Sequence, residues 1–281
     1  MQKVRFVDLF AGIGGIRKGF EIAFNKFGFK TECVMTSEIK PHACTVLKAN
    51  HPDEEVRGDV TKIDTGSIPD FDILLGGFPC QAFSYAGRRL GFDDTRGTLF
   101  FEIERILKEK RPFGFILENV EGLVTHDREN AGHPIGKTLS VILGNLDAIG
   151  YKVTWKVLNA KDFGLAQDRK RIYIVGTRKE FVPLDDFEKK HAVLADILEK
   201  GKPTINTKFT RMLFSHYKPK QLYGKSIKDK RGGGNNIHSW DICLKGNVTE
   251  EQKKLLNMMS HERRKKKWAA IHGIGRNAAH G

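Results

Sequence analysis

The stretch that decides the fold is "FVDLFAGIGG", residues 6–15. An apolar, β-rich run leads into a turn that contains Gly12, Gly14 and Gly15, and a helix-period stretch follows over about residues 14–27. Glycine lets a chain turn tightly and come close to a ligand, and the N-terminus of a helix favours negative charge. The spacing differs from the G-x-G-x-x-G dinucleotide motif. The stretch therefore predicts a strand–turn–helix unit whose turn either binds a ligand or is only structural.

The same alternation continues to about residue 177. Helix-period stretches lie at about 40–50, 97–110 and 137–149, between further β-rich runs that read "ECVMTSE", "DILLGG", "FGFILENV", "KVTWKVLN" and "RIYIVGT". Strands that alternate with helices predict an α/β fold with a doubly wound, mostly parallel, Rossmann-like sheet. Ligands bind such sheets beyond the carboxyl ends of the strands, so the site is expected at that edge.

Two acidic residues are expected at the ends of the next two strands. Glu38 follows Gly15 by 23 residues, where a carboxylate can accept hydrogen bonds from ribose hydroxyls. Asp59, in "RGDV", is placed to accept a hydrogen bond from an adenine amino group. There is no Walker lysine, which disfavours ATP. The turn and the two acids together indicate a cofactor that carries a nucleoside.

A cysteine stands at the expected end of the fourth strand, in "GGFPCQAFSYAGRR", residues 76–89. A thiolate is a nucleophile, and nearby cations such as Arg88 and Arg89 lower the pKa of a thiol. A lone cysteine is more often a buried, inert side chain. The presence of Glu118 in "ENV", at the end of the next strand along the chain, favours the catalytic interpretation of Cys80, because a nucleophile beside a proton donor suits covalent catalysis.

The other three cysteines are interpreted as small hydrophobic residues. Cys33, Cys44 and Cys243 have no C-x-x-C spacing among them or with Cys80, so neither a metal site nor a redox motif is expected.

Five segments of the chain, in order, resemble successive motifs of the DNA (cytosine-5) methyltransferases of bacterial restriction–modification systems. The resemblance covers about residues 4–178, and the segments read "DLFAGIGG", "GGFPCQAFSYAG", "DDTRGTLFFEI", "ENV" and "GLAQDRKRIYIVG". Its most specific parts are the Pro-Cys-Gln core and the Gln-x-Arg-x-Arg run of Gln167, Arg169 and Arg171.

The resemblance implies transfer of a methyl group from S-adenosylmethionine to carbon 5 of cytosine in duplex DNA, with S-adenosylhomocysteine as the product. The residues that it implies for cofactor binding are Phe10, Ala11, Gly12, Ile13, Gly14, Gly15, Glu38, Ile39, Asp59, Val60, Pro79 and Leu99.

For catalysis, the resemblance implies that the cytosine leaves the duplex stack and that Cys80 attacks its carbon 6. Glu118 would contact ring nitrogen 3 and the exocyclic amine, while Arg171 and Arg169 would lie near the base oxygen and the catalytic loop. That loop, from Gln81 to Thr98, would close over DNA with contacts from Gln81, Ser84, Arg88 and Arg89.

The composition of the chain changes after Thr177: residues 178–281 are polar and basic, with weak strand signals. This change predicts a domain boundary near 178–185. We expect a cofactor-binding catalytic domain over residues 1–180 and a smaller, partial target-recognition domain over 181–281. This second part contains one clear helix candidate, which begins at Thr249 because "TEEQ" matches a capping box.

The net charge of +14 lies in the second half of the chain. Residues 1–150 hold 19 Lys and Arg against 21 Asp and Glu, whereas residues 151–281 hold 29 against 13. A strongly basic half predicts a polyanionic partner, here DNA. Lys265, Lys266 and Lys267 in "RRKKKW" are candidates for phosphate contact; the alternative is a solvated helix end.

The chain departs from the family near its C-terminus. The family's last motif carries a Gly-Asn-x-Val-x-Pro signature, and "GNVTEE" at residues 246–251 lacks the proline. We therefore expect a truncated protein, or one half of a split enzyme that works with a complementing C-terminal chain or companion subunit.

Three alternative functions remain open on the sequence. One is a non-catalytic fragment that binds DNA or cofactor, another an RNA cytosine methyltransferase, and the most distant is an NAD dehydrogenase, which explains neither Cys80 nor the arginine run. No apolar run reaches the length of a membrane span, and the N-terminus does not look like a signal peptide. The expected setting is the bacterial cytoplasm, with no membrane partner and with a cognate restriction endonuclease in the same system.

Overall fold

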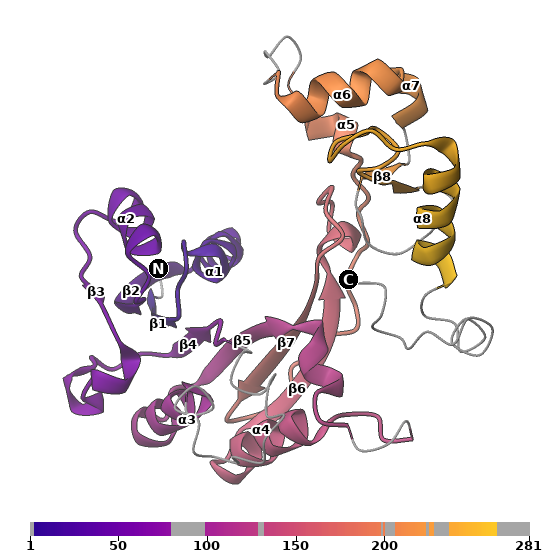
Figure 1. The fold of residues 1–281 in the computed structure, drawn as a ribbon. Helices are drawn as coiled ribbons and strands as arrows, with labels where there is room; N and C mark the ends of the chain where they lie inside the picture. Colours follow the sequence, from indigo (N-terminus) through magenta and orange to yellow (C-terminus); the bar gives the residue numbers. More distant parts are fainter. Residues whose placement is uncertain are drawn as a thin grey trace. The chain divides into compact units, whose positions relative to one another are not determined.

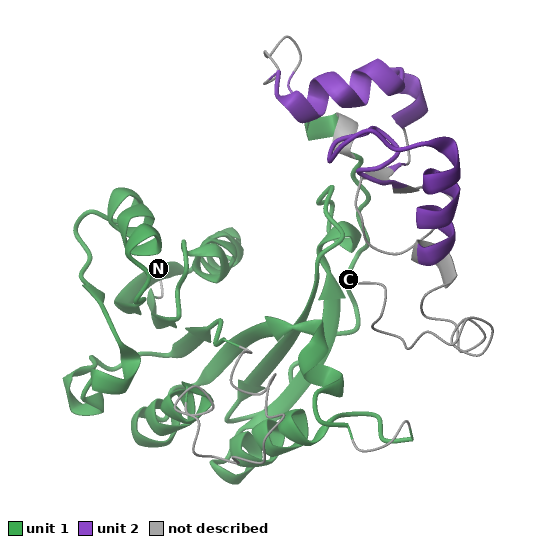
Figure 2. Cartoon of the chain, viewed as in Figure 1, with its two compact units in different colours: residues 1–198 green, residues 199–281 purple. Residues whose placement is uncertain are grey.

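The computed structural model describes residues 3–79, 99–128, 132–197, 199, 206–222, 225–227 and 236–262. The chain divides into two compact units, residues 1–198 and 199–281 (Figure 2). Each unit is described by itself.

The first unit is built on a seven-stranded sheet with the strand order β3-β2-β1-β4-β5-β7-β6 (Figure 1). All pairings are parallel except those of β7, which is antiparallel to both of its neighbours. This arrangement confirms the predicted mostly parallel, doubly wound sheet. The strands are β1 (Lys3–Leu9), β2 (Lys30–Ser37), β3 (Val56–Arg57), β4 (Ile73–Gly76), β5 (Gly114–Val120), β6 (Lys152–Asn159) and β7 (Lys170–Thr177).

Four helices connect these strands, and they overlap the four predicted helix-period stretches. They are α1 (Gly15–Lys26), α2 (Pro41–Asn50), α3 (Leu99–Lys110) and α4 (Lys137–Ala148). The buried residues Phe100, Ile103 and Leu107 of α3 recur at intervals of three and four, which places them on one face of the helix.

Apolar side chains cover both faces of the sheet, because successive residues of a strand point to opposite sides. The main core joins strand residues such as Leu74 and Leu117 to Ile103 of α3 and Ile142 of α4. On the other face, Phe6 and Leu75 form a smaller cluster with Phe20 of α1. Burial of these side chains is the main force that holds the layers together.

The first unit continues past β7, so the units divide later in the chain than the predicted boundary. Leu184 is buried, and the backbone N–H of Lys190 donates to the carbonyl of Asp162 at 2.8 Å. The N–H of Gly164 in turn donates to the carbonyl of Lys190 at 2.8 Å. These contacts hold the segment after β7 against the β6–β7 corner.

The second unit confirms the predicted helix after Thr249 and contains helices that were not predicted. Helix α8 (Glu250–Glu262) begins with a capping box, in which the N–H of Gln252 donates to Thr249 Oγ1 at 3.2 Å and the N–H of Thr249 donates to Gln252 Oε1 at 2.9 Å. The sequence predicted one clear helix after residue 177, and the structure contains more than one. The described residues of that part also contain α5 (Leu194–Ile197, in the first unit), α6 (Lys208–His216), α7 (Pro219–Leu222), β8 (Ser226–Ile227) and β9 (Asn236–Ile237).

Helix α6 escaped prediction because its cap is formed by two threonines. Thr207 Oγ1 accepts from the N–H of Thr210, and Thr210 Oγ1 accepts from the N–H of Thr207, whereas the usual sequence signature has Glu or Gln at the second position. Leu213 of this helix joins Ile237 and Ile242 in a small core of the second unit. None of the described helices has the length and apolar character that crossing a membrane requires.

Candidate active site

The predicted site residues follow the ends of neighbouring strands along one edge of the sheet. Because parallel strands end at the same edge, the strand order places Asp59 after β3, Glu38 after β2, the glycine turn after β1, and Pro79 after β4. Glu118 lies near the end of β5. Strand β7 is antiparallel to β5 and begins at this same edge, which brings Arg171 into the site.

The turn after β1 adopts the backbone conformation that its glycines predict. Gly12 and Gly14 have φ angles of 56° and 85°, and Phe10 has a φ of 56°. A positive φ is uncommon for a residue other than glycine and often marks a functional site. Gly14 is the N-cap of α1 and offers no capping side chain, and the first turn of α1 holds no acidic residue. The first N–H groups of α1 therefore suit an anionic group of a ligand.

Glu38 ties the end of β2 to this turn. Its Oε2 accepts from the backbone N–H of Gly12 at 2.7 Å, and its Oε1 accepts from the N–H groups of Ile39 and Lys40 at 2.9 and 2.8 Å. A carboxylate oxygen has two lone-pair sites, so Oε2 retains one acceptor site that a hydroxyl group can use.

Two large apolar side chains flank the turn and Glu38. Ile13 is 63% exposed and Ile39 is 68% exposed. Apolar side chains that stay exposed beside convergent polar groups are typical of ligand sites.

Asp59 and Val60 begin the segment after β3. Asp59 Oδ1 accepts from the N–H and the hydroxyl of Thr61 at 3.1 and 2.8 Å, and no described residue donates to Oδ2. Val60 is only 2% exposed as a whole residue, and its side chain belongs to the main core.

Glu118 and Arg171 form an ion pair between neighbouring strands. Arg171 Nε lies 2.8 Å from Glu118 Oε1, and both side chains are about one-fifth exposed. Glu118 stands opposite Tyr173 in the antiparallel β5–β7 ladder. Burial raises the pKa of the Tyr173 phenol, and the charge of Glu118 raises it further. The pair thus presents a fixed carboxylate with a neutral phenol beside it.

Gly77 shows how closely the strand ends approach one another. A methyl group placed on Gly77 would lie 3.8 Å from Glu118 Oε2 and 3.8 Å from the carbonyl oxygen of Phe10. The Glu118 carboxylate, the end of β4 and the glycine turn are therefore neighbours. In addition, Asn119 Nδ2 donates to the carbonyl of Phe78 at 3.0 Å, which anchors the chain just before Cys80 to β5.

Several predicted residues lie outside the described residues. They are the proposed nucleophile and loop residues Cys80, Gln81, Ser84, Arg88 and Arg89, and the basic cluster Lys265, Lys266 and Lys267. The other three cysteines are half-buried free thiols, as expected. Burial raises the pKa of the Cys33 thiol to about 11, which makes it unreactive.

A pocket of about 510 Å³ lies at the start of β7, lined by Val120, Glu121, Gly122, Gln167, Asp168, Arg169, Lys170 and Arg171. Lys170 Nζ lies 3.2 Å from Glu121 Oε1. The backbone N–H of Arg169 donates a hydrogen bond to Asn159 Oδ1 at 3.0 Å. Asn159 Nδ2 also donates to Asp168, and this hydrogen bond lowers the pKa of that carboxyl. The Gln-x-Arg-x-Arg run thus forms the rim beside the Glu118–Arg171 pair.

The sequence alone suggested no role for Asp8 or Asn119, although Asp8 lies in the "DLFAGIGG" motif and Asn119 in the "ENV" motif. Asp8 in β1 is 1% exposed, and none of the described residues donates a hydrogen bond to its carboxyl oxygens. Burial raises the pKa of Asp8 to about 7, against the lowering effect of Arg17. Arg17 itself is buried and forms a bidentate pair with Glu54 at 2.6 and 2.7 Å. The sequence feature that could have drawn attention to Asp8 is its position as an acidic residue in a largely apolar strand.

Comparisons with known proteins agree with this geometry. Residues 4–280 match the family described as C-5 cytosine-specific DNA methylase. The chain is 62% identical to the type II methyltransferase M.NlaIV of Neisseria lactamica over 98% of its own length and 65% of that protein. It is also 62% identical to M.NgoBV of Neisseria gonorrhoeae, over 95% of its own length and 63% of that protein. The chain therefore spans less than two thirds of the length of these relatives.

Two solved structures share the fold. The methyltransferase EhMeth of Entamoeba histolytica superposes with a TM-score of 0.59 at 15% identity, over 99% of this chain and 88% of that one. A DNMT2 variant of Spodoptera frugiperda gives a TM-score of 0.56 at 20% identity, over 80% of this chain and 66% of that one. The family match over nearly the whole chain and the close relatives lead to one assignment: the chain belongs to the C-5 cytosine-specific DNA methylase family.

Proposed function

We propose that this chain is the cofactor-binding and catalytic part of an enzyme that methylates carbon 5 of cytosine in duplex DNA. One observation carries the proposal: the glycine turn, Glu38, the segment that leads to Cys80, and the Glu118–Arg171 pair all lie along one edge of the sheet. Membership of the family and the close type II methyltransferase relatives support it.

The residues at this edge fit S-adenosylmethionine. The uncapped N-terminus of α1 suits the carboxylate of the methionine part. The remaining acceptor site on Glu38 suits a ribose hydroxyl, and Asp59 Oδ2 suits the adenine amino group. The exposed Ile13 and Ile39 suit the flat adenine ring. When bound, the cofactor supplies an electrophilic methyl group.

In the proposed reaction, the target cytosine leaves the duplex stack to reach the edge of the sheet. The Cys80 thiolate adds to carbon 6, and the electron pair of the 5,6 double bond makes carbon 5 nucleophilic. Carbon 5 takes the methyl group and then loses its proton, so the double bond re-forms and the carbon–sulfur bond breaks. Glu118 holds a proton at ring nitrogen 3 and contacts the exocyclic amine. Arg171 keeps the Glu118 carboxylate in position.

The proposed partners follow from the charge of the chain and from the relatives. The basic residues 151–281 suit the phosphates of duplex DNA, and we assign the second unit, residues 199–281, to target recognition. The relatives extend beyond the part that this chain matches, and we propose that the family's last motifs, in the same polypeptide or in a companion chain, take part in the reaction. Type II methyltransferase relatives support a bacterial, cytoplasmic setting with a cognate restriction endonuclease.

The proposal is tested by methyl transfer from tritiated S-adenosylmethionine, with and without the companion chain. The substrates are duplex DNA and, in parallel, transfer RNA. Incorporation into DNA by the parent chain and none by Cys80→Ser is expected, because serine oxygen is a far weaker nucleophile toward carbon 6. Incorporation only into transfer RNA would favour the RNA enzyme instead. Cofactor binding without transfer to either substrate, even with the companion chain, would favour the non-catalytic fragment.

A further inference from the structure

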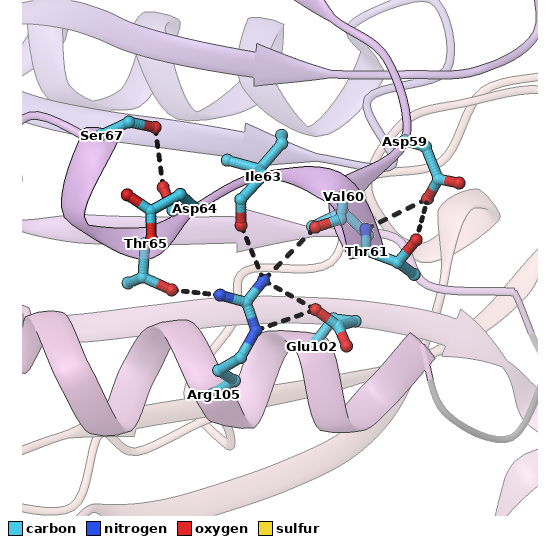
Figure 3. A network of polar contacts seen from close by, with 9 residues as sticks. All are labelled: Asp59, Val60, Thr61, Ile63, Asp64, Thr65, Ser67, Glu102 and Arg105. Atoms are coloured by element: carbon cyan, nitrogen blue, oxygen red, sulfur yellow. Dashed lines mark hydrogen bonds and ion pairs between the residues drawn. The ribbon is translucent and has the colours of Figure 1, made fainter.

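Arg105 of α3 holds the segment that carries Asp59 and Val60 (Figure 3). Its Nη2 donates to the carbonyls of Val60 and Ile63 at 3.3 and 3.1 Å, and its Nη1 donates to Thr65 Oγ1. Val60 begins the short turn η1 (Val60–Lys62), Ile63 follows that turn directly, and Thr65 begins the next turn, η2 (Thr65–Ser67). One guanidinium group therefore fastens two consecutive turns to a helix that lies 40 to 45 residues further along the chain.

The orientation of Arg105 is itself fixed. Glu102, one turn earlier in α3, accepts from Arg105 Nε at 2.9 Å and from Nη2 at 2.7 Å. Figure 3 shows the guanidinium between this carboxylate and the two turns. A planar fork held in this way can serve several acceptors at once, which a lysine ammonium cannot do in the same geometry.

Val60, which follows Asp59, is held from two sides. The Val60 side chain packs into the main core, while the carbonyl of Val60 faces Arg105. Asp59 precedes Val60 directly, and its Oδ1 is fixed by Thr61 within the same turn. In Figure 3 the second carboxylate oxygen of Asp59 points away from Thr61. Arg105 thus fixes the turn on which the Asp59 carboxylate depends.

Helix α3 also begins at Leu99, another residue proposed to contact the cofactor. We infer that Arg105 is a positioning residue of the cofactor site: it locks the Asp59–Val60 turn to α3 and so fixes the Asp59 carboxylate for the adenine amino group. This inference rests on the proposed function of the same site. Arg105 touches neither the cofactor nor the base in this assignment.

Loss of Arg105 would take a donor from three acceptors. The carbonyl of Ile63 and the hydroxyl of the buried Thr65 would lose the donor described above, while the carbonyl of Val60 would keep only the N–H of Ile63. Buried polar groups without partners are costly, so the turn is expected to shift toward water. Asp59 would move with it, which weakens the contact to the adenine amino group.

The experiment measures binding of S-adenosylhomocysteine by titration calorimetry to the parent chain, Arg105→Ala, Arg105→Lys and the control Lys108→Ala. Lys108 is an exposed cation on the same helix. We expect about tenfold weaker binding for Arg105→Ala, equivalent to about 1.4 kcal/mol, a smaller loss for Arg105→Lys, and less than a twofold change for the control. Thr65→Val removes one acceptor and keeps the Arg105–Glu102 pair, so it provides a milder variant with about a twofold to threefold loss if Arg105→Ala does not fold.

A second ligand separates positioning from general loosening of the fold. S-inosylhomocysteine carries a carbonyl oxygen at position 6 of the purine in place of the adenine amino group, so it lacks the amino donor that is proposed to bind Asp59. With this ligand the loss caused by Arg105→Ala should shrink to less than about threefold, and the loss caused by Thr65→Val should disappear. An equal loss with both ligands, or no loss with either, would overturn the inference and leave the proposed function standing. No binding of S-adenosylhomocysteine by the parent chain would instead contradict the proposed function, and this inference with it.

Discussion

Arg171 Nε and Glu118 Oε1 lie 2.8 Å apart, between β5 and its antiparallel neighbour β7. Among the described strands of this sheet, β7 alone starts at the edge where β5 ends, and it therefore brings a cation of the Gln-x-Arg-x-Arg run to that carboxylate. Tyr173, opposite Glu118 in the ladder, adds a neutral phenol. The antiparallel direction of β7 thus places Arg171 beside Glu118, where it can hold the carboxylate in position.

Glu118→Gln should slow methyl transfer by at least about a hundredfold, the lower range for loss of a positioned acid or base. Glutamine keeps the shape of the side chain but can neither accept nor release a carboxyl proton. Single-turnover transfer to DNA measures the rate. Glu121→Gln is the matched control, since Glu121 lies nearby on the pocket rim and pairs with Lys170. Equal rates for the two variants would leave Glu118 with a structural role.

Arg171→Ala should lower the transfer rate through Glu118, and a double-mutant cycle can show this. The ion pair predicts that removal of Arg171 costs much less in the Glu118→Gln background than in the parent chain, because the partner charge is already gone. The affinity for S-adenosylhomocysteine should stay within about twofold, since neither residue belongs to the proposed cofactor contacts. Additive effects on the rate would mean that the two side chains act independently.

Asp8 predicts a pH dependence of stability. Its pKa is about 7 in the folded chain, because of burial, against 3.8 as the reference value. The folded state therefore holds a proton that the unfolded state releases. The resulting stabilisation is present in full below pH 3.8 and is lost as pH rises through about 7.

Asp8→Asn should remove this dependence. Between pH 5 and pH 7 the parent chain should lose about 2 kcal/mol of unfolding free energy relative to the variant, measured by urea denaturation. Asp53→Asn, which changes an exposed carboxylate, should follow the parent curve. Parallel curves for the parent and Asp8→Asn would show that Asp8 does not titrate in this range.

The basic cluster at residues 265–267 predicts a change in the salt dependence of DNA binding. Replacement of Lys265, Lys266 and Lys267 by alanine should reduce the slope of log affinity against log salt by roughly one to three units, since each phosphate contact contributes about 0.9. Cofactor affinity should not change. An unchanged slope would indicate that the cluster is a solvated helix end.

The sheet and its edge could be predicted because their signals are local. Apolar runs and helix periods predicted the succession of strands and helices along the chain, and Glu38 and Asp59 do lie just after the strands expected before them. The antiparallel direction of β7 could not be predicted, because pairing depends on contacts between segments far apart in sequence. The same holds for Arg105: nothing in α3 indicates that its guanidinium reaches Val60 and Thr65.

Other differences have equally specific causes. The side chain of Val60 turned out to be buried, because an apolar residue beside a binding turn can serve the core as readily as a ligand. The Thr207–Thr210 cap of α6 has no Glu or Gln to mark it. The role of Asn119, which holds the carbonyl of Phe78, depends on the approach of β5 to the end of β4.

The most direct test of the central claim is a search for the covalent bond between Cys80 and DNA. Duplex DNA of random sequence, with fluorine at carbon 5 of every cytosine, is incubated with S-adenosylmethionine, the chain and the companion chain. Fluorine cannot leave carbon 5 as a cation, so the adduct should persist after methyl transfer and peptide mass spectrometry should find the nucleotide on Cys80. The adduct should be absent with Cys80→Ser and should require the cofactor for full yield. Tritium transfer to ordinary DNA without any adduct on Cys80 from the fluorinated duplex, or with an adduct on another residue, would contradict the account.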